Sequence, residues 1–314
     1  MAPDRVNSGD PALSQGAGRW RDLGRRALTA CVLAPVVLFC LWQGGLAWEM
    51  LIVAATLGLG FEWSQLCRAT GRRAMALLTV LGVIGLLGVD GRWLAAIAAI
   101  PAGAIVVWLL TGRERRQGLG APYGYVSTGP KWSVETWGGR EGRQSFSLPA
   151  GVFYIGPSVV ALLWLRAEPN GLADMLLVLL IVWASDISAY LIGRWIGGAK
   201  LAPRISPGKT WSGAIGGLSG AAIVAAGMAL WYGPAIGANS SVQSFFLLCL
   251  LLSVVSQAGD LMESAIKRRF GVKDSGWLVP GHGGLFDRLD GILVAVPAAA
   301  ALVLVLGRGV VVFG

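Results

Sequence analysis

Long apolar runs, separated by short polar segments, dominate the hydrophobic pattern of the chain. Many of the runs approach the ~20 residues that an α-helix needs to cross a bilayer, where a helix satisfies its own backbone hydrogen bonds. The pattern therefore predicts an all-α, polytopic integral membrane protein. It predicts nine spans, at 27–43, 47–66, 74–89, 93–111, 150–165, 171–193, 212–232, 242–262 and 289–307.

The overall composition agrees with a membrane protein and argues against an ordinary soluble domain. Only 14% of the 314 residues are charged and 55% are hydrophobic, whereas soluble domains carry about 25% charged residues. The net charge is +9, but the basic residues lie in short loops between apolar runs. Because that placement fits an anionic lipid leaflet, we expect membrane lipids and no nucleic acid among the partners.

Basic residues are distributed unequally between the two sides of the predicted topology. If the N-terminus is cytoplasmic, 23 of the 26 Lys and Arg residues fall on the cytoplasmic side, and only Arg92, Arg166 and Arg308 lie outside. The positive-inside rule therefore predicts a cytoplasmic N-terminus. The predicted cytoplasmic segments are 1–26, 67–73, 112–149, 194–211 and 263–288.

Composition divides the chain into four parts. Residues 1–26 form a polar, basic tail that we expect to be disordered. Residues 27–111 form the N-terminal membrane helices, and 112–149 form a polar, Gly-rich cytoplasmic loop. The remaining residues, 150–314, form a second membrane domain, which contains the candidate chemistry.

The seventh span contains two overlapping GxxxG pairs, Gly213 with Gly217 and Gly216 with Gly220. Small residues at this spacing let the backbones of membrane helices approach closely. We therefore expect the seventh span to pack tightly against a neighbouring helix.

The eighth span is predicted to continue beyond the membrane and to end in charged residues. We expect one helix from Val242 to Phe270, ended by Gly271 in a left-handed cap. Asp260 would lie ~27 Å from the outer end of this helix, at the cytoplasmic edge of the hydrocarbon. Four polar residues share one face of the helix by their spacing: Asp260, Glu263, Ser264 and Lys267.

The ninth helix is predicted to begin near Asp287, with Asp290 one turn later and both at the depth of Asp260. Acidic residues at a helix start can simply interact with the helix dipole, and that interpretation stays open for Asp290. Carboxylates that remain ionised near lipid need a compensating charge, which a hard divalent cation with oxygen ligands supplies. The sequence therefore predicts a metal site where the eighth and ninth helices meet.

Two further segments place polar groups on the same side of the membrane. Asp186 lies in the otherwise apolar sixth span, where an ionisable residue is a functional candidate. The Gly-Lys-Thr run that ends at Thr210 resembles a P-loop, but Pro203 stands where that motif needs glycine, and no apolar strand precedes it. We reject the P-loop and expect phosphate ligands at the start of the seventh helix, namely Ser206, Lys209 and Thr210.

The only histidine, His282, lies in a Pro-Gly-His-Gly-Gly segment just before the ninth helix. Its glycines let backbone amides approach an anion. A role in the site and a simple exposed loop position both stay open for His282.

Four sequence motifs carry a resemblance to a known family. Residues 259–264 read G-D-L-x-E-S, 186–194 read D-x-x-A-Y-x-x-G-R, and 205–211 read I-S-P-G-K-T-W. Residues 264–290 contain S-x-x-K-R-x-x-x-x-K-D-x-G and then P-x-H-G-G-x-x-D-R-x-D. Together the motifs closely resemble the signature of the phosphatidate cytidylyltransferases (CDP-diacylglycerol synthases), while Ser212 stands where that family is expected to have Glu or Gln.

The resemblance implies transfer of CMP from CTP to phosphatidic acid, giving CDP-diacylglycerol and pyrophosphate, with Mg²⁺ and room for a second cation. It implies an integral protein of a bacterial-type inner membrane with a cytoplasmic active site, and it leaves a homodimer open. The residues expected to be catalytic are Asp260 and Asp287, which would bind the metal, together with Lys267, Arg288 and Asp186. The residues expected to bind substrate are Ser206, Lys209, Thr210, Ser264, Arg268, Lys273, Asp274, His282 and Asp290.

A cation- or proton-coupled transporter is the alternative from a different class of protein. In a transporter, Asp186 and the interfacial carboxylates would carry the ion. No paired broken helices are evident in matching halves, however, and the ionisable residues gather at one face only. A scaffold with a basic lipid-facing surface would leave Asp186 and the acidic cluster without a purpose.

Overall fold

The structure is a computed structural model, and it describes residues 32–69, 71–116, 140–232, 242–276, 278 and 283–306. Three predicted features lie wholly or largely outside the described residues: the tail at 1–26, most of the loop at 112–149, and His282.

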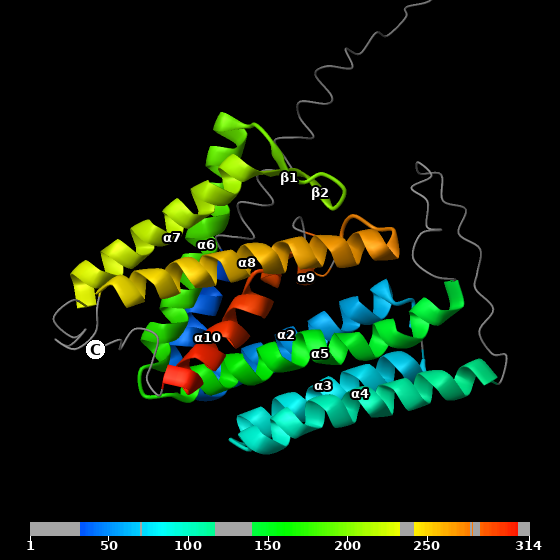
Figure 1. Cartoon of the computed structure of the whole chain (residues 1–314). Helices are drawn as coiled ribbons and strands as arrows, with labels where there is room; N and C mark the ends of the chain where they lie inside the picture. Colours follow the sequence, from blue (N-terminus) through cyan, green and yellow to red (C-terminus); the bar gives the residue numbers. More distant parts are fainter. Residues whose placement is uncertain are drawn as a thin grey trace, which may run out of the picture.

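The described chain is an α-helical bundle, as predicted (Figure 1). Seven of its helices are long and apolar enough to cross a membrane, which confirms the all-α polytopic class. Two shorter apolar helices, Val32–Gln43 and Ile292–Val305, coincide with the predicted first and last spans, and the count of nine spans stays a prediction. The long helices are α2 (Gly45–Leu66), α3 (Arg72–Val89), α4 (Trp93–Arg116), α5 (Arg140–Ala167), α6 (Gly171–Ile196), α7 (Trp211–Tyr232) and α8 (Val242–Phe270).

Two helices extend well past their predicted spans. The spans were expected at 93–111 and 150–165, whereas α4 ends at Arg116 and α5 begins at Arg140. Hydropathy marks only the apolar part of a membrane helix, so it carries no signal for a polar end that leaves the bilayer. The end of α4 and the start of α5 therefore both lie inside the range 112–149 that was predicted as a polar loop.

A short antiparallel hairpin connects α6 to α7, within the segment 194–211 that we predicted to be cytoplasmic. Its strands are β1 (Lys200–Ala202) and β2 (Ser206–Thr210), and Lys200 pairs with Thr210. Strands this short show no usable alternation of apolar and polar residues, so the pattern could not reveal them. The hairpin brings Lys209 to the base of α7.

The central helix, α8, has the predicted bounds. It runs from Val242 to Phe270, and Gly271 follows with φ of 73°, the left-handed conformation expected for the cap. At ~1.5 Å per residue this helix is longer than the ~30 Å hydrocarbon core. In the view of Figure 1, α7 lies above α8, and α2, α5 and α10 lie below it.

The predicted ninth helix is divided into two. α9 (Phe286–Leu289) contains Asp287, and α10 (Ile292–Leu306) follows after a turn at Asp290 and Gly291. The prediction of one continuous helix starting near Asp287 was therefore wrong, because a turn interrupts the helix after Leu289. Asp290 nevertheless keeps helical dihedral angles (φ −49°, ψ −52°), so the two carboxylates remain about one helical turn apart.

The GxxxG glycines of α7 pack against α6, as predicted. A Cβ atom added to Gly216 would lie 3.0 Å from the carbonyl oxygen of Ser188, and one added to Gly220 would lie 2.5 Å from that of Ala184. These approaches leave no room for a larger side chain. α6 and α7 therefore form a tight pair of helices beside α8.

We predict that Gly220→Leu destabilises the protein by about 1–3 kcal/mol, because the new side chain must push α7 away from α6. Gly227→Leu is the matched control in the same helix, since no atom lies within 4 Å of a Cβ built at Gly227. Thermal unfolding of the purified protein in detergent measures both. Equal melting temperatures for the two variants would contradict the packing described here.

Candidate active site

Charged side chains from α6, β2, α8 and α9 converge at one end of the bundle. Lys209, at the end of β2, forms an ion pair with Asp260 in α8. Asp186, in α6, lies close enough to Asp260 and Lys209 for their charges to act on it. The structure thus brings together three predicted site residues that are up to 74 positions apart in the sequence.

Lys267 joins α8 to α9 through two carboxylates. Its Nζ atom lies 2.8 Å from Oε1 of Glu263 and 2.8 Å from Oδ1 of Asp287. Glu263 is 1% exposed, so its negative charge has little access to water. Lys267 therefore compensates part of the negative charge of Glu263 and Asp287. This is a structural role, in addition to the catalytic role predicted for Lys267.

Three carboxylates form a cluster between the C-terminal half of α8 and the turn before α10. Asp260, Glu263 and Asp290 each offer one oxygen, and these oxygens all lie within 4.8 Å of one another. Asp290 also accepts a hydrogen bond from the backbone amide of Gly291, at 2.7 Å. An ionised cluster of this kind calls for additional positive charge.

The cluster fits a hard divalent cation. All of its ligand atoms are carboxylate oxygens, which Mg²⁺ prefers, and Mg²⁺ usually binds through one or two carboxylates plus substrate phosphates and water. Asp260, a predicted metal ligand, belongs to the cluster. Asp287, the other predicted ligand, lies beside it and is held by Lys267, so its role as a ligand stays a prediction.

Backbone amides fix the position of Asp287. Its Oδ2 atom accepts hydrogen bonds from the amides of Ser275 and Gly284, each at 3.1 Å. Burial alone would raise the pKa of Asp287, but hydrogen bonds, including those from Lys267 and the Ser275 amide, bring it below its ordinary value. Asp287 is therefore a fixed, ionised carboxylate at neutral pH.

Two predicted phosphate ligands make structural contacts. Thr210 is 4% exposed, and its Oγ1 atom accepts a hydrogen bond from the amide of Gly213 at 3.1 Å, as a helix cap does. Arg268 donates to the carbonyl oxygens of Ile205 (3.3 Å) and Val272 (3.1 Å), which ties the β-hairpin to the end of α8. Phosphate binding by Thr210 and Arg268 stays a prediction.

Other predicted residues lie in the same segments but outside the carboxylate cluster and the ion pairs described above. Their side chains are half-buried in two cases and exposed in three. They are Ser206, Ser264, Lys273, Asp274 and Arg288.

A polar network within the bundle connects α6, α7 and α8 next to the site. The Ser185 and Ser253 hydroxyl groups are 2.9 Å apart, and Nε2 of Gln257 donates to the carbonyl oxygen of Ala214 at 3.3 Å. Ser185 adjoins Asp186 in the sequence, and Gln257 precedes Asp260 by about one helical turn. Hydrogen bonds of this kind hold membrane helices at a fixed distance, so the network positions both carboxylates.

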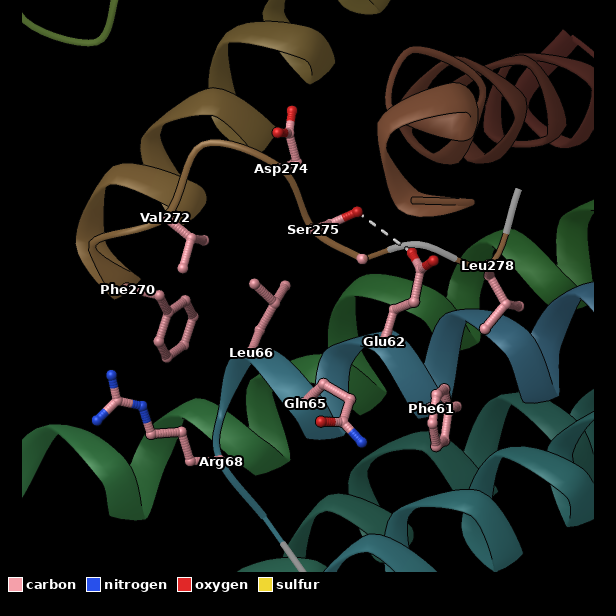
Figure 2. A pocket seen from close by; sticks show the side chains of 11 residues that line it. Phe61, Glu62, Gln65, Leu66, Arg68, Phe270, Val272, Asp274, Ser275 and Leu278 are labelled. Carbon is pink, nitrogen blue, oxygen red and sulfur yellow. Dashed lines mark hydrogen bonds between the residues drawn. The ribbon is translucent and has the colours of Figure 1, made fainter. Parts of the chain in front are cut away.

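Our sequence reasoning missed Glu62, a buried residue of α2 that is 1% exposed. Its carboxylate accepts hydrogen bonds from the amides of Leu285 and Phe286, each at 2.8 Å. It also accepts one from the Ser275 hydroxyl at 3.2 Å, which Figure 2 shows as a dashed line. A signal was present, because the rule that identified Asp186 applies to any ionisable residue in an apolar span.

A cavity of about 220 Å³ lies between the end of α2 and the segment after α8 (Figure 2). Its lining includes Glu62 and Ser275, and it also includes Phe61, Arg68, Phe270 and Asp274. Asp260, Glu263 and Asp290 do not line it. The cavity is therefore distinct from the carboxylate cluster, although Ser275, which lines it, donates its backbone amide to Asp287.

We predict that Lys267→Met lowers the free energy of unfolding by about 3 kcal/mol, because it leaves two buried carboxylates without their shared cation. Lys273→Met is the matched control. Lys273 is exposed, and such a change usually alters stability by about 0.5 kcal/mol or less. Thermal unfolding in detergent compares the two, and identical melting temperatures would contradict the proposed neutralising role of Lys267.

Comparison with known proteins gives a consistent result. The family model described as "Cytidylyltransferase family" matches residues 24–306. The phosphatidate cytidylyltransferase of Brucella abortus is 40% identical over 293 residues, covering 91% of this chain and 93% of that protein. That of Pseudomonas aeruginosa is 36% identical over 293 residues, covering 91% of this chain and 99% of that protein.

A third relative matches a shorter part of the chain. The phosphatidate cytidylyltransferase of Haemophilus influenzae is 42% identical over 147 residues, 45% of this chain and 51% of that protein. These relatives are named for nucleotidyl transfer, so they give no support to the transporter alternative. The resemblance seen in the motifs is confirmed, and the chain belongs to the Cytidylyltransferase family.

Proposed function

We propose that this protein transfers CMP from CTP to phosphatidic acid, forming CDP-diacylglycerol and pyrophosphate. One observation carries the proposal: a cluster of carboxylates and lysines lies at one end of an apolar helix bundle. The chain also shares 36–40% identity with phosphatidate cytidylyltransferases over 91% of its length.

The location of the cluster suits two very different substrates. Phosphatidic acid stays in the bilayer through its acyl chains and presents its phosphate at the interface. CTP is a soluble polyanion that reaches the interface from the aqueous side. A site at the end of the membrane helices, with cations among its carboxylates, is where the two phosphates can meet.

The chemical step is an in-line displacement at the α-phosphorus of CTP. A phosphate oxygen of phosphatidic acid forms the new bond to this phosphorus, while the bond to the oxygen that bridges the α- and β-phosphates breaks. Pyrophosphate leaves with that oxygen, so no covalent enzyme intermediate is needed. The chain's main tasks are positioning and charge stabilisation.

Asp260, with Glu263 and Asp290, would hold Mg²⁺, and Asp287 is the further predicted ligand. When bound, Mg²⁺ neutralises negative charge on the phosphates and on the leaving pyrophosphate. Lys209 is paired with Asp260 in the structure, so it is placed to exchange this carboxylate for a phosphate. Lys267, together with Arg288, which follows Asp287 in α9, supplies positive charge on the α9 side of the site.

We predict that the purified protein releases pyrophosphate from CTP and phosphatidic acid only when Mg²⁺ is present. Asp260→Asn and Asp287→Asn should each lower turnover by about 100-fold or more, because each removes an anionic group at nearly constant volume. Asp90→Asn is the matched control, since Asp90 pairs with Arg92 on an exposed surface. Near-normal activity in both site variants, with the protein folded, would contradict the assignment.

The membrane location follows from the same geometry. The protein is an integral membrane protein, and we propose that it resides in a bacterial-type inner membrane with its site facing the cytoplasm. The site draws on segments 194–211 and 263–288, and predicted cytoplasmic segments hold 23 of the 26 basic residues. The positive-inside rule therefore supports this orientation.

We predict that Arg204→Cys and Lys273→Cys, made in a cysteine-free background, resist a membrane-impermeant thiol reagent in intact cells and react after lysis. Arg92→Cys is the control for the opposite side and should react in intact cells. All three positions are exposed, so differences in labelling report the side of the membrane. Labelling of Arg204→Cys from outside would reverse the proposed orientation.

A further inference from the structure

We infer that Glu62, from the N-terminal half of the chain, is a positioning residue that holds Asp287 in its working orientation. The activity test of this inference rests on the proposed function, whereas its test by amide hydrogen exchange does not. Glu62 does not belong to the carboxylate cluster of Asp260, Glu263 and Asp290. It acts through the segment that connects α8 to α9.

Glu62 holds both ends of this connecting segment with one carboxylate. Its Oε2 atom accepts from the hydroxyl of Ser275, near the start of the segment, and from the amide of Phe286, at the start of α9. Its Oε1 atom accepts from the amide of Leu285. These partners are 213 to 224 positions away in the sequence, so the contact joins the two halves of the protein.

The residues that donate backbone hydrogen bonds to Asp287 either also donate to Glu62 or lie next in the sequence to a residue that does. Ser275 donates its hydroxyl to Glu62 and its backbone amide to Asp287. Gly284, whose amide also binds Asp287, directly precedes Leu285. Any movement of the segment away from Glu62 therefore moves the donors of Asp287, and with them the contact between Asp287 and Lys267.

The packing around Glu62 leaves little space at two glycines, Gly276 and Gly284. A Cβ atom added to Gly276 would lie 2.8 Å from Oε1 of Glu62, and one added to Gly284 would lie 2.8 Å from Oε2. Glycine at these two positions thus lets the backbone close around the carboxylate. Gly276 and Gly284 belong to the motif that resembles the family signature. The close approach of Glu62, which lies outside that motif, explains why glycine is needed at both positions.

Helix α2, which carries Glu62, is itself anchored to its neighbours through Trp63. The neighbouring residue, Trp63, donates its indole N–H to the carbonyl oxygen of Ser147 at 2.9 Å, and its ring lies 5.6 Å from that of Phe286. Glu62 therefore projects from a helix that is fixed to α5 and packed on α9. A rigid support of this kind is what orientation of a functional group requires.

Glutamine cannot replace Glu62 in this role. Its side chain is nearly isosteric, but it offers one oxygen to three donors and places an NH₂ group against a backbone N–H. A buried donor without an acceptor is costly, so the segment should relax away from the side chain. The effect should appear as lost order in the segment and as slower chemistry, with substrate binding much less affected.

The test compares Glu62→Gln with the parent protein by two measurements. Amide hydrogen exchange should become faster in residues 283–286. In the CTP assay, kcat should fall about 10- to 100-fold, as for other residues that orient a site ligand, while KM for CTP changes by less than about threefold. The matched control is Glu49→Gln in the same helix, about 20 Å away along its axis, which should change neither measurement.

A second variant keeps the test decisive if Glu62→Gln does not fold. Ser275→Ala removes one donor to Glu62 and leaves the backbone amide that binds Asp287. It should lower kcat by a smaller factor than Glu62→Gln. When Ser275→Ala is combined with Glu62→Gln, kcat should fall almost no further than in Glu62→Gln alone, because the two side chains act as one unit.

Parent-like exchange and kcat in Glu62→Gln would overturn the inference and leave the proposed function intact. So would parent-like kcat and exchange in Ser275→Ala if Glu62→Gln fails to fold, because the linking hydrogen bond would then have no influence on Asp287. An inactive parent protein counts against the proposed function instead. In that case, faster exchange confined to the connecting segment would still support the role of Glu62.

Discussion

Negative charge held at the edge of an apolar helix bundle is the constraint on which this structure depends. A carboxylate removed from water must be paired or hydrogen-bonded to remain ionised. Here Asp260 is paired through Lys209 from the β-hairpin, and Asp287 through Lys267 and backbone amides. The hairpin, the end of α8 and the segment before α9 are therefore held together by the charges that the site needs.

Close approach of backbones is the second requirement, since carboxylates from different helices cannot otherwise come within a few ångströms. Gly259, next to Asp260, lies so near α10 that an added Cβ atom would be 2.9 Å from the carbonyl oxygen of Asp290. The glycines of α7 similarly let α6 bring Asp186 toward the site. The abundance of glycine thus serves the electrostatics of the site as well as helix packing.

The sequence predicted the features that depend on local pattern. α8 has its predicted ends because hydrophobic periodicity and the cap at Gly271 are read from neighbouring residues. The partners of each charge were not predictable in the same way. The sequence places Lys267 one helical turn after Glu263, with which it pairs, and only tertiary packing also brings it to Asp287. The same holds for Glu62, whose partners are more than 200 positions away.

Helices α2 and α5 consequently do more than anchor the chain. Besides Glu62 of α2, Ser158 of α5 donates to the carbonyl oxygen of Leu293 in α10 at 2.5 Å. The segment that carries Asp287 and Asp290 is therefore bound to α2 before these residues and to α5 after them. A transporter would need to open its ion-binding carboxylates alternately to the two sides of the membrane, by rocking one part of the helix bundle against another. A nucleotidyltransferase needs them fixed while the phosphates react, and these contacts supply that fixed position.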